Sequence, residues 1–381
     1  MRIRKIVLLI MIAVLCVSSY GASYTYAEIN TDVSAYSAVL MEQDSGRVLY
    51  GKKLHEKRRI ASITKIMTAV LAVESGKLDE MVTISDTAVR TEGSSIYLAP
   101  GQKIKLRDLV YGLMLRSGND AAQAIAETVG GSIEGFVYMM NEKAAEIGML
   151  NTQFINPHGL DGKGFEHYST AYDMAILARY AMQHEDYREI AGTKFHKAPN
   201  TEQSWDYAWK NKNKLLTGLY EFSTGGKTGF TKQAGRTLVS TASKEKENLI
   251  CVTITAGDDW NDHISLFNKG FDQYDLVKLI KKGPVGEVPK ELKGHVYTKD
   301  AYKYPLTTEE QGEVDIRYEI EEGKEFKNGD KVGLASIYIG EKKVGEKALF
   351  YSSSKLKLQA SYWLDGIKEV FSMMVGEEVD G

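Results

Sequence analysis

The stretch Arg59-Ile60-Ala61-Ser62-Ile63-Thr64-Lys65-Ile66-Met67-Thr68 decides how the rest of the chain is interpreted. Its apolar residues continue at three- and four-residue steps to Leu71, which predicts a buried helix that ends at Gly76. Ser62 at the start of this helix and Lys65 three residues later lie on one face, so the amine can reach the hydroxyl. Because burial disfavours the charged ammonium, Lys65 can act as a base.

The Ser-x-x-Lys spacing carries little information by itself. Ser243 with Lys246 repeats it in a charged turn, and Ser352 with Lys355 repeats it in a polar segment. We expect no catalysis at either pair. The interpretation of Ser62 therefore depends on the other motifs of the chain.

Length and composition indicate an exported globular protein. The chain has 381 residues, of which 43% are hydrophobic and 26% charged, as expected for one large domain and a smaller one. Residues 1–27 combine a basic start, a short apolar run and small residues, which predicts a secretory signal cut after Ala27; an uncleaved anchor is the alternative. Removing its three basic residues from 48 basic and 51 acidic residues leaves a net charge of −6, which argues against a nucleic-acid partner. The remaining cysteine, Cys251, reads as a buried thiol of a core strand.

The order of expected elements predicts an α+β fold. A strand, a tight turn and a second strand over residues 36–50 precede several helices, and consecutive strands follow from residue 223, so a sheet begun at the N-terminus is completed after the helices. Beyond a linker near residues 281–294, short alternating strands predict a small all-β domain, and residues 361–374 have the apolar spacing of an amphipathic helix. The predicted divisions are a signal peptide (1–27), a catalytic domain (28–283), a β-sandwich-like domain (284–351) and a C-terminal helix (352–381).

Two further motifs accompany Ser62 and Lys65. Ser117-Gly118-Asn119 falls in a turn between helices, and Lys227-Thr228-Gly229 opens a glycine-flanked strand. Ser-x-Asn and Lys-Thr-Gly each occur once in the chain. Together and in this order, the three motifs are the active-serine signature of class A β-lactamases and penicillin-binding proteins.

This signature supports acyl transfer by four side chains. We expect Ser62 to be the nucleophile, at a helix N-terminus that favours developing negative charge. Lys65 takes its proton. Lys227 keeps Lys65 neutral by repulsion between like charges, and Ser117 relays a proton to the leaving amine.

The remaining motif residues are predicted to bind substrate. Asn119 holds Lys65 and the substrate amide, and Thr228 offers its hydroxyl to a substrate carboxylate. Gly229 lets an extended peptide lie against the strand. The backbone amides of Ser62 and Phe230 are the predicted donors to the oxyanion. The pattern calls for no cofactor and no metal.

The chain resembles the low-molecular-mass penicillin-binding proteins, which are serine D-alanyl-D-alanine carboxypeptidases. The resemblance rests on the three motif segments and on Asn156-Pro157-His158-Gly159-Leu160-Asp161, and it extends over residues 34–275. Within the family, the sequence of these segments most resembles that of the sporulation-associated member of endospore-forming bacteria. The resemblance implies a penicillin-binding fold, removal of the terminal D-alanine from peptidoglycan stem peptides, covalent inhibition by β-lactams, and contact of the C-terminal helix with the outer face of the membrane.

Several alternatives stay open at this point. His158 with Asp161 or Asp173 could suggest a Ser-His-Asp triad, although no Gly-x-Ser-x-Gly elbow is present. A β-lactamase would need a Glu-x-x-x-Asn segment that residues 140–165 lack, and a non-catalytic wall scaffold would not need three intact motifs. The C-terminal helix could dock on its own β-domain instead of a membrane. One departure from the family is the lack of an arginine over residues 257–263 to bind the substrate carboxylate.

Overall fold

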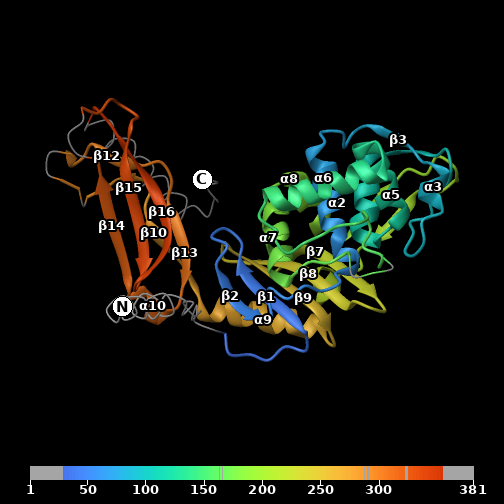
Figure 1. The fold of residues 1–381 in the computed structure, drawn as a ribbon, viewed down its shortest axis with the longest axis horizontal. Helices are drawn as coiled ribbons and strands as arrows, with labels where there is room; N and C mark the ends of the chain where they lie inside the picture. Colours follow the sequence, from blue (N-terminus) through green and yellow to red (C-terminus); the bar gives the residue numbers. More distant parts are fainter. Residues whose placement is uncertain are drawn as a thin grey trace, which may run out of the picture.

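The computed structural model describes residues 29–354, apart from residues 163, 165, 287, 290, 291 and 322–324. The predicted signal peptide and residues 355–381 of the predicted C-terminal helix lie outside the described residues. Figure 1 shows one part in which helices cover a sheet, and a second part made mainly of strands. No helix among the described residues is long and apolar enough to cross a membrane.

The first part is built on a five-stranded antiparallel sheet with the order β2-β1-β9-β8-β7. The N-terminal hairpin therefore pairs with strands that come about 200 residues later, which confirms the predicted α+β order. Gly46 closes the hairpin turn with a φ of +74°, a conformation that glycine adopts without steric cost. The five strands are β1 (Ser37–Glu42), β2 (Val48–Lys52), β7 (Ser223–Thr231), β8 (Gly235–Lys244) and β9 (Glu247–Ala256).

Alternate residues of this sheet face two different cores. Val39, Val252 and Ile254 pack with the helical layer. Leu40, Leu249 and Cys251 face the opposite way, toward α9 (Asp259–Gln273), which runs along the other face of the sheet (Figure 1). Period-two alternation places neighbouring residues of a strand on opposite faces, so both faces of the central strands are covered.

Helices and short strands form the layer above the sheet and carry two of the three motifs (Figure 1). The buried α2 begins with Lys65, and the turn of Ser117 joins η2 to α5. The elements of this layer are η1 (Ala61–Thr64), α2 (Lys65–Glu74), β3 (Met81–Thr83), α3 (Asp86–Val89), β4 (Lys103–Lys105), α4 (Leu106–Tyr111), η2 (Gly112–Arg116), α5 (Asn119–Gly130), α6 (Ile133–Glu146), α7 (Ala171–Ala181), α8 (Glu185–Gly192), β5 (Phe195–Ala198) and β6 (Tyr207–Lys210). The short η3 (Leu215–Leu219) contributes Leu215 to the core on the α9 side of the sheet.

The second part contains the predicted all-β unit. Its five-stranded sheet has the order β11-β12-β16-β15-β14, and β10 pairs separately with β13. Since β10 precedes the predicted linker and pairs beyond it, this strand belongs structurally with the later chain; the division at residue 283 stays a prediction. The elements are β10 (Asp275–Ile280), β11 (Gly283–Pro284), β12 (Val296–Thr298), β13 (Tyr302–Leu306), α10 (Thr308–Gln311), β14 (Val314–Ile320), β15 (Lys331–Ile339) and β16 (Lys342–Tyr351).

Candidate active site

Ser62 lies on a short 3₁₀ turn that precedes the helix. The sequence predicts Ser62 in the first turn of the helix, but α2 begins only at Lys65, and Ala61 has a φ of +48°. The Thr64 hydroxyl donates to the Ala61 carbonyl (2.8 Å) and contacts Nε2 of the buried His167 (2.7 Å), which fixes the tight turn. As a result Ser62 stays partly accessible while the next residues are buried.

The Lys65 amine is fully buried and bonded on three sides. Its Nζ lies 3.0 Å from Ser62 Oγ, 2.7 Å from Asn119 Oδ1 and 2.6 Å from the His158 carbonyl oxygen. Burial, followed by the positive charges of Lys227 and Lys212, holds the pKa of Lys65 well below its usual range. A neutral amine beside a hydroxyl is the arrangement that can accept its proton.

A second buried amine reaches the site from the sheet. Lys227 Nζ on β7 donates to Ser117 Oγ (3.1 Å) and to the Thr228 carbonyl (2.7 Å). Burial and the charge of Lys212 lower the pKa of Lys227 to about 7. Ser117 adopts a left-handed conformation, with a φ of +65°, at the turn between η2 and α5. Residues other than glycine seldom adopt this conformation, and those that do are found often at functional sites.

The rest of the Lys-Thr-Gly segment forms the open side of the site. β7 is an edge strand, and Thr228, Gly229 and Phe230 are at least partly accessible, with 65% of Phe230 exposed. A Cβ on Gly229 would lie 2.9 Å from the Ser62 backbone nitrogen and 2.4 Å from Thr237 Oγ1. Glycine is therefore required where β7 passes the serine turn.

The structure places the loop of residues 156–161 at the site, and two contacts there were not foreseen from the sequence. The loop of residues 156–161 touches Lys65 through the main-chain carbonyl of His158, whereas the His158 imidazole accepts a hydrogen bond from the Leu160 amide (3.2 Å) and burial lowers its pKa to about 3. The carboxylate of Asp120 is buried and accepts hydrogen bonds from Ser95 Oγ (2.6 Å) and the Ile96 amide (3.0 Å). Neither the main-chain contact of His158 nor the structural role of Asp120 is associated with a sequence motif, so neither could be predicted from the sequence.

An arginine does lie next to β7, although not over residues 257–263, where the family pattern would put it. Arg236 on β8 stands directly opposite Phe230 of β7 in the register. Its guanidinium forms an ion pair with the buried Asp259 and lies 5.7 Å from the centre of the Trp260 ring, and its side chain is 40% exposed. Paired residues on adjacent strands share a face of the sheet, so Arg236 and Phe230 lie on the same face.

The comparisons with known proteins agree with this geometry. The family model described as D-alanyl-D-alanine carboxypeptidase matches residues 24–258, well over half of the chain. The chain belongs to this family. It is a serine-type D-alanyl-D-alanine carboxypeptidase, as its resemblance to the penicillin-binding proteins implies. Within the described residues, no group of three or more His, Cys, Asp or Glu side chains could hold a metal ion.

Individual relatives cover most of the chain. The D-alanyl-D-alanine carboxypeptidase DacF of Bacillus subtilis is 37% identical over 269 residues, which are 68% of this chain and 68% of that protein. The D-alanyl-D-alanine carboxypeptidase of Streptomyces sp. strain K15 is 32% identical over 278 residues, covering 68% of this chain and 94% of that protein. Penicillin binding protein 5 of Haemophilus influenzae superposes with a TM-score of 0.72 at 26% identity, covering 84% of this chain and 97% of that one.

Proposed function

We propose that this carboxypeptidase removes the terminal D-alanine from peptidoglycan stem pentapeptides through an acyl-enzyme on Ser62. The observation that carries the proposal is the 3.0 Å contact between Ser62 Oγ and the buried Lys65 Nζ, whose pKa burial and neighbouring positive charges hold well below its usual range. Only a neutral amine at this distance can take the hydroxyl proton as the oxygen attacks.

In the acylation step, the Ser62 Oγ–H proton passes to Lys65 Nζ as Oγ bonds to the carbonyl carbon of the penultimate D-alanine. The backbone amides of Ser62 and Phe230 stabilise the oxyanion of the tetrahedral intermediate. Ser117, bonded to Lys227, gives its hydroxyl proton to the leaving amine as the C–N bond breaks and D-alanine departs, and the proton that Lys65 took from Ser62 replaces it, which leaves Lys65 neutral again. Water then hydrolyses the ester and releases the shortened stem peptide. A β-lactam would acylate the same oxygen by opening its ring.

The substrate would bind along the exposed edge of β7. Main-chain groups of an edge strand are free to pair with an extended peptide, and Gly229 leaves room for it beside Ser62. The side-chain oxygen Oδ1 of Asn119 accepts a hydrogen bond from Lys65, and its Nδ2 would donate to the substrate amide. Thr228 and the cation of Lys227 would face the terminal carboxylate.

We propose that Arg236 supplies the carboxylate-binding charge that residues 257–263 lack. Replacing Arg236 with alanine is expected to raise KM about tenfold, because a hydrogen bond to a charged group contributes about 1.5 kcal/mol or more, and to leave kcat nearly unchanged. Steady-state release of D-alanine measures both constants. Arg236→Lys should recover part of the loss. Since Arg236→Ala leaves the buried Asp259 unpaired, Tm is measured in parallel, and an unchanged KM in a folded variant would rule out this role.

Lys212 offers a test of the electrostatics without touching the motifs. Its charge lowers the pKa of both Lys65 and Lys227, so Lys212→Met should raise both pKa values. Because protonation of Lys65 removes the base as pH falls, the acid limb of the pH profile of kcat/KM is expected to move to higher pH. Lys214→Met, which removes an exposed cation two residues away, is the matched control and should leave the profile in place. If the two variants had the same pH profile, the acid limb would not reflect protonation of Lys65.

The direct test of the activity is release of D-alanine from a synthetic peptide ending in D-Ala-D-Ala. A matched peptide ending in D-Ala-L-Ala is the control for stereochemistry. We expect release from the first peptide, inhibition by penicillin, and little release from the second. No release from the D-Ala-D-Ala peptide would contradict the proposed function.

We also propose that the protein is exported by residues 1–27 and held at the outer face of the cytoplasmic membrane by the amphipathic helix of residues 352–381, so that it trims wall peptides and limits crosslinking. The basic and apolar start of the sequence and the apolar spacing of residues 361–374 support this placement. The resemblance to the sporulation-associated member supports a role in the spore cortex. Fractionation of cells that express the protein with and without residues 352–381 tests it, and equal amounts in the membrane fraction would contradict the anchor.

A further inference from the structure

We infer that two exposed aromatic side chains, Tyr97 and Trp205, form a rim that binds the glycan strand of peptidoglycan while a stem peptide occupies the Ser62 site. The inference rests on the proposed function, since it names the polymer to which that peptide is attached. It concerns recognition of the polymer and adds no chemical step. Tyr97 is 85% exposed and Trp205 is 65% exposed.

The conformation of Tyr97 distinguishes it from an ordinary exposed residue. Its φ of +63° lies in the left-handed region, which a bulky side chain adopts only with backbone strain. Single exposed aromatic residues need no explanation, but one that is held outward in a strained conformation does. The ring gains no burial in return, so contacts of its own cannot offset the strain.

The strain is maintained by the same residues that build the active site. The buried carboxylate of Asp120 accepts hydrogen bonds from the amides on either side of Tyr97, those of Ile96 (3.0 Å) and Leu98 (3.3 Å). The backbone amide of the neighbouring Asn119 donates a hydrogen bond to the Ser94 carbonyl (2.6 Å). The backbone around Tyr97 is therefore fixed to the turn that presents Asn119 to Lys65, while its ring is exposed to solvent.

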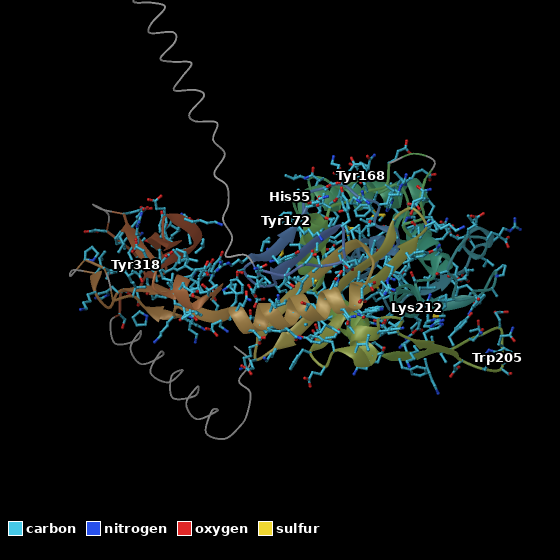
Figure 2. The ribbon with its side chains drawn as sticks, turned by 90° about the horizontal axis from the view of Figure 1, so that it is seen from below. His55, Tyr168, Tyr172, Trp205, Lys212 and Tyr318 are labelled. Carbon is cyan, nitrogen blue, oxygen red and sulfur yellow. The ribbon has the colours of Figure 1, made fainter. Side chains whose placement is uncertain are left out.

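Trp205 reaches this rim from the hairpin of β5 and β6. The Tyr207 hydroxyl, two residues further on, donates to the Tyr97 carbonyl (3.3 Å) and to Gln102 Oε1 (3.0 Å), which ties the hairpin to the Tyr97 loop. Figure 2 labels Trp205 at the tip of the hairpin, at the end of the molecule opposite Tyr318 of the second part. The two aromatic residues thus lie on segments that are bonded to each other, and the Tyr97 segment is bonded in turn to the backbone of Asn119.

The chemistry of the hairpin tip fits a neutral sugar. Residues 201–206 are all exposed, and besides Trp205 they supply hydroxyl, amide and carboxylate groups from Thr201, Gln203, Ser204 and two acidic residues. An aromatic face packs against the C–H groups of a pyranose ring, while these polar groups exchange hydrogen bonds with its hydroxyl and acetamido groups. The carboxylates would repel a polyanion, so a phosphate-rich wall polymer is the poorer ligand.

The test compares D-alanine release from two substrates that differ only in the polymer: a soluble peptide ending in D-Ala-D-Ala, and isolated peptidoglycan with the same stem peptide. Tyr97→Ala and Trp205→Ala are expected to lower the rate on peptidoglycan about fivefold and to leave the rate on the soluble peptide nearly unchanged. Tyr97→Phe, which keeps the ring, should behave as wild type. Tyr138→Ala removes a similarly exposed aromatic side chain from α6 and is the matched control.

A binding measurement separates failure of this inference from failure of the proposed function. The Ser62→Ala protein should cosediment with peptidoglycan stripped of its stem peptides, and adding Tyr97→Ala or Trp205→Ala should reduce the bound fraction. The inference would be wrong if the variants released D-alanine from peptide and peptidoglycan with equal losses of rate, or with unchanged rates on both. It would also be wrong if the Tyr97→Ala and Trp205→Ala changes left the cosedimenting fraction unchanged. A wild type inactive on the soluble peptide would contradict the proposed function instead, since glycan binding does not need Ser62.

Discussion

Ser62→Ala is expected to lower kcat for release of D-alanine by about 10⁴-fold or more, because the variant has no nucleophile to form the acyl-enzyme. Fold and substrate binding should persist. The Ser62 hydroxyl lies on a partly accessible turn whose shape is fixed by Thr64 and His167, so its removal leaves that support intact. Stopped-time assay of free D-alanine with a peptide ending in D-Ala-D-Ala gives the rate, and Tm monitors folding.

Ser243→Ala is the control for this prediction. Ser243 has the same spacing to Lys246 that Ser62 has to Lys65, but it belongs to β8, where it pairs with Asn248 at the end of the β8–β9 hairpin. The activity of Ser243→Ala should equal that of the wild-type protein. If Ser62→Ala retained substantial activity, another group would have to attack the peptide, and the assignment of Ser62 would be wrong.

Lys65→Met should lower kcat/KM by about 10²- to 10⁴-fold, the usual contribution of a positioned general base. Methionine is similar in length and uncharged, so it suits a fully buried position without supplying an amine. Asn119 Oδ1 and the His158 carbonyl each lose a donor at 2.6–2.7 Å. For that reason the rate is reported only for protein whose Tm shows a folded state.

Lys65→Arg distinguishes proton transfer from electrostatic stabilisation. Arginine keeps a positive charge and cannot be deprotonated, so it cannot serve as a base. We expect it to be as inactive as Lys65→Met. Recovery of activity by arginine would show that Lys65 acts through its charge, and would contradict its proposed role as the base.

The sequence was sufficient to predict those elements whose local residue pattern agrees with their long-range pairing. The hairpin of β1 and β2, the buried α2 and the paired β8 and β9 have regular apolar periodicity and clear turn residues, and the structure has them. It was insufficient for α8, the β5–β6 hairpin and α9. The start of α9, Asp259-Trp260-Asn261-Asp262, is polar, and only its contact with the Leu40 and Leu249 face of the sheet makes it a stable helix.

The motif residues were identifiable because their chemistry requires particular side chains at particular spacings. The structure gathers Ser62, Lys65, Ser117, Asn119 and Lys227 through contacts of 2.7–3.1 Å. The groups that support them were not identifiable. The His158 carbonyl could belong to any residue type, and Asp120 is recognisable as an anchor only when the loop it binds is seen. Arg236 lies on a strand where the register, and not the sequence, brings it beside Phe230.

The most direct test of the central claim is to locate the covalent adduct after brief exposure of the protein to benzylpenicillin. Mass spectrometry of the digested protein should find the added mass on the peptide that contains Ser62, and Ser62→Ala should carry none. Lys65→Met should acylate far more slowly than wild type. An adduct on another residue, or an unmodified wild-type protein, would contradict Ser62 as the nucleophile.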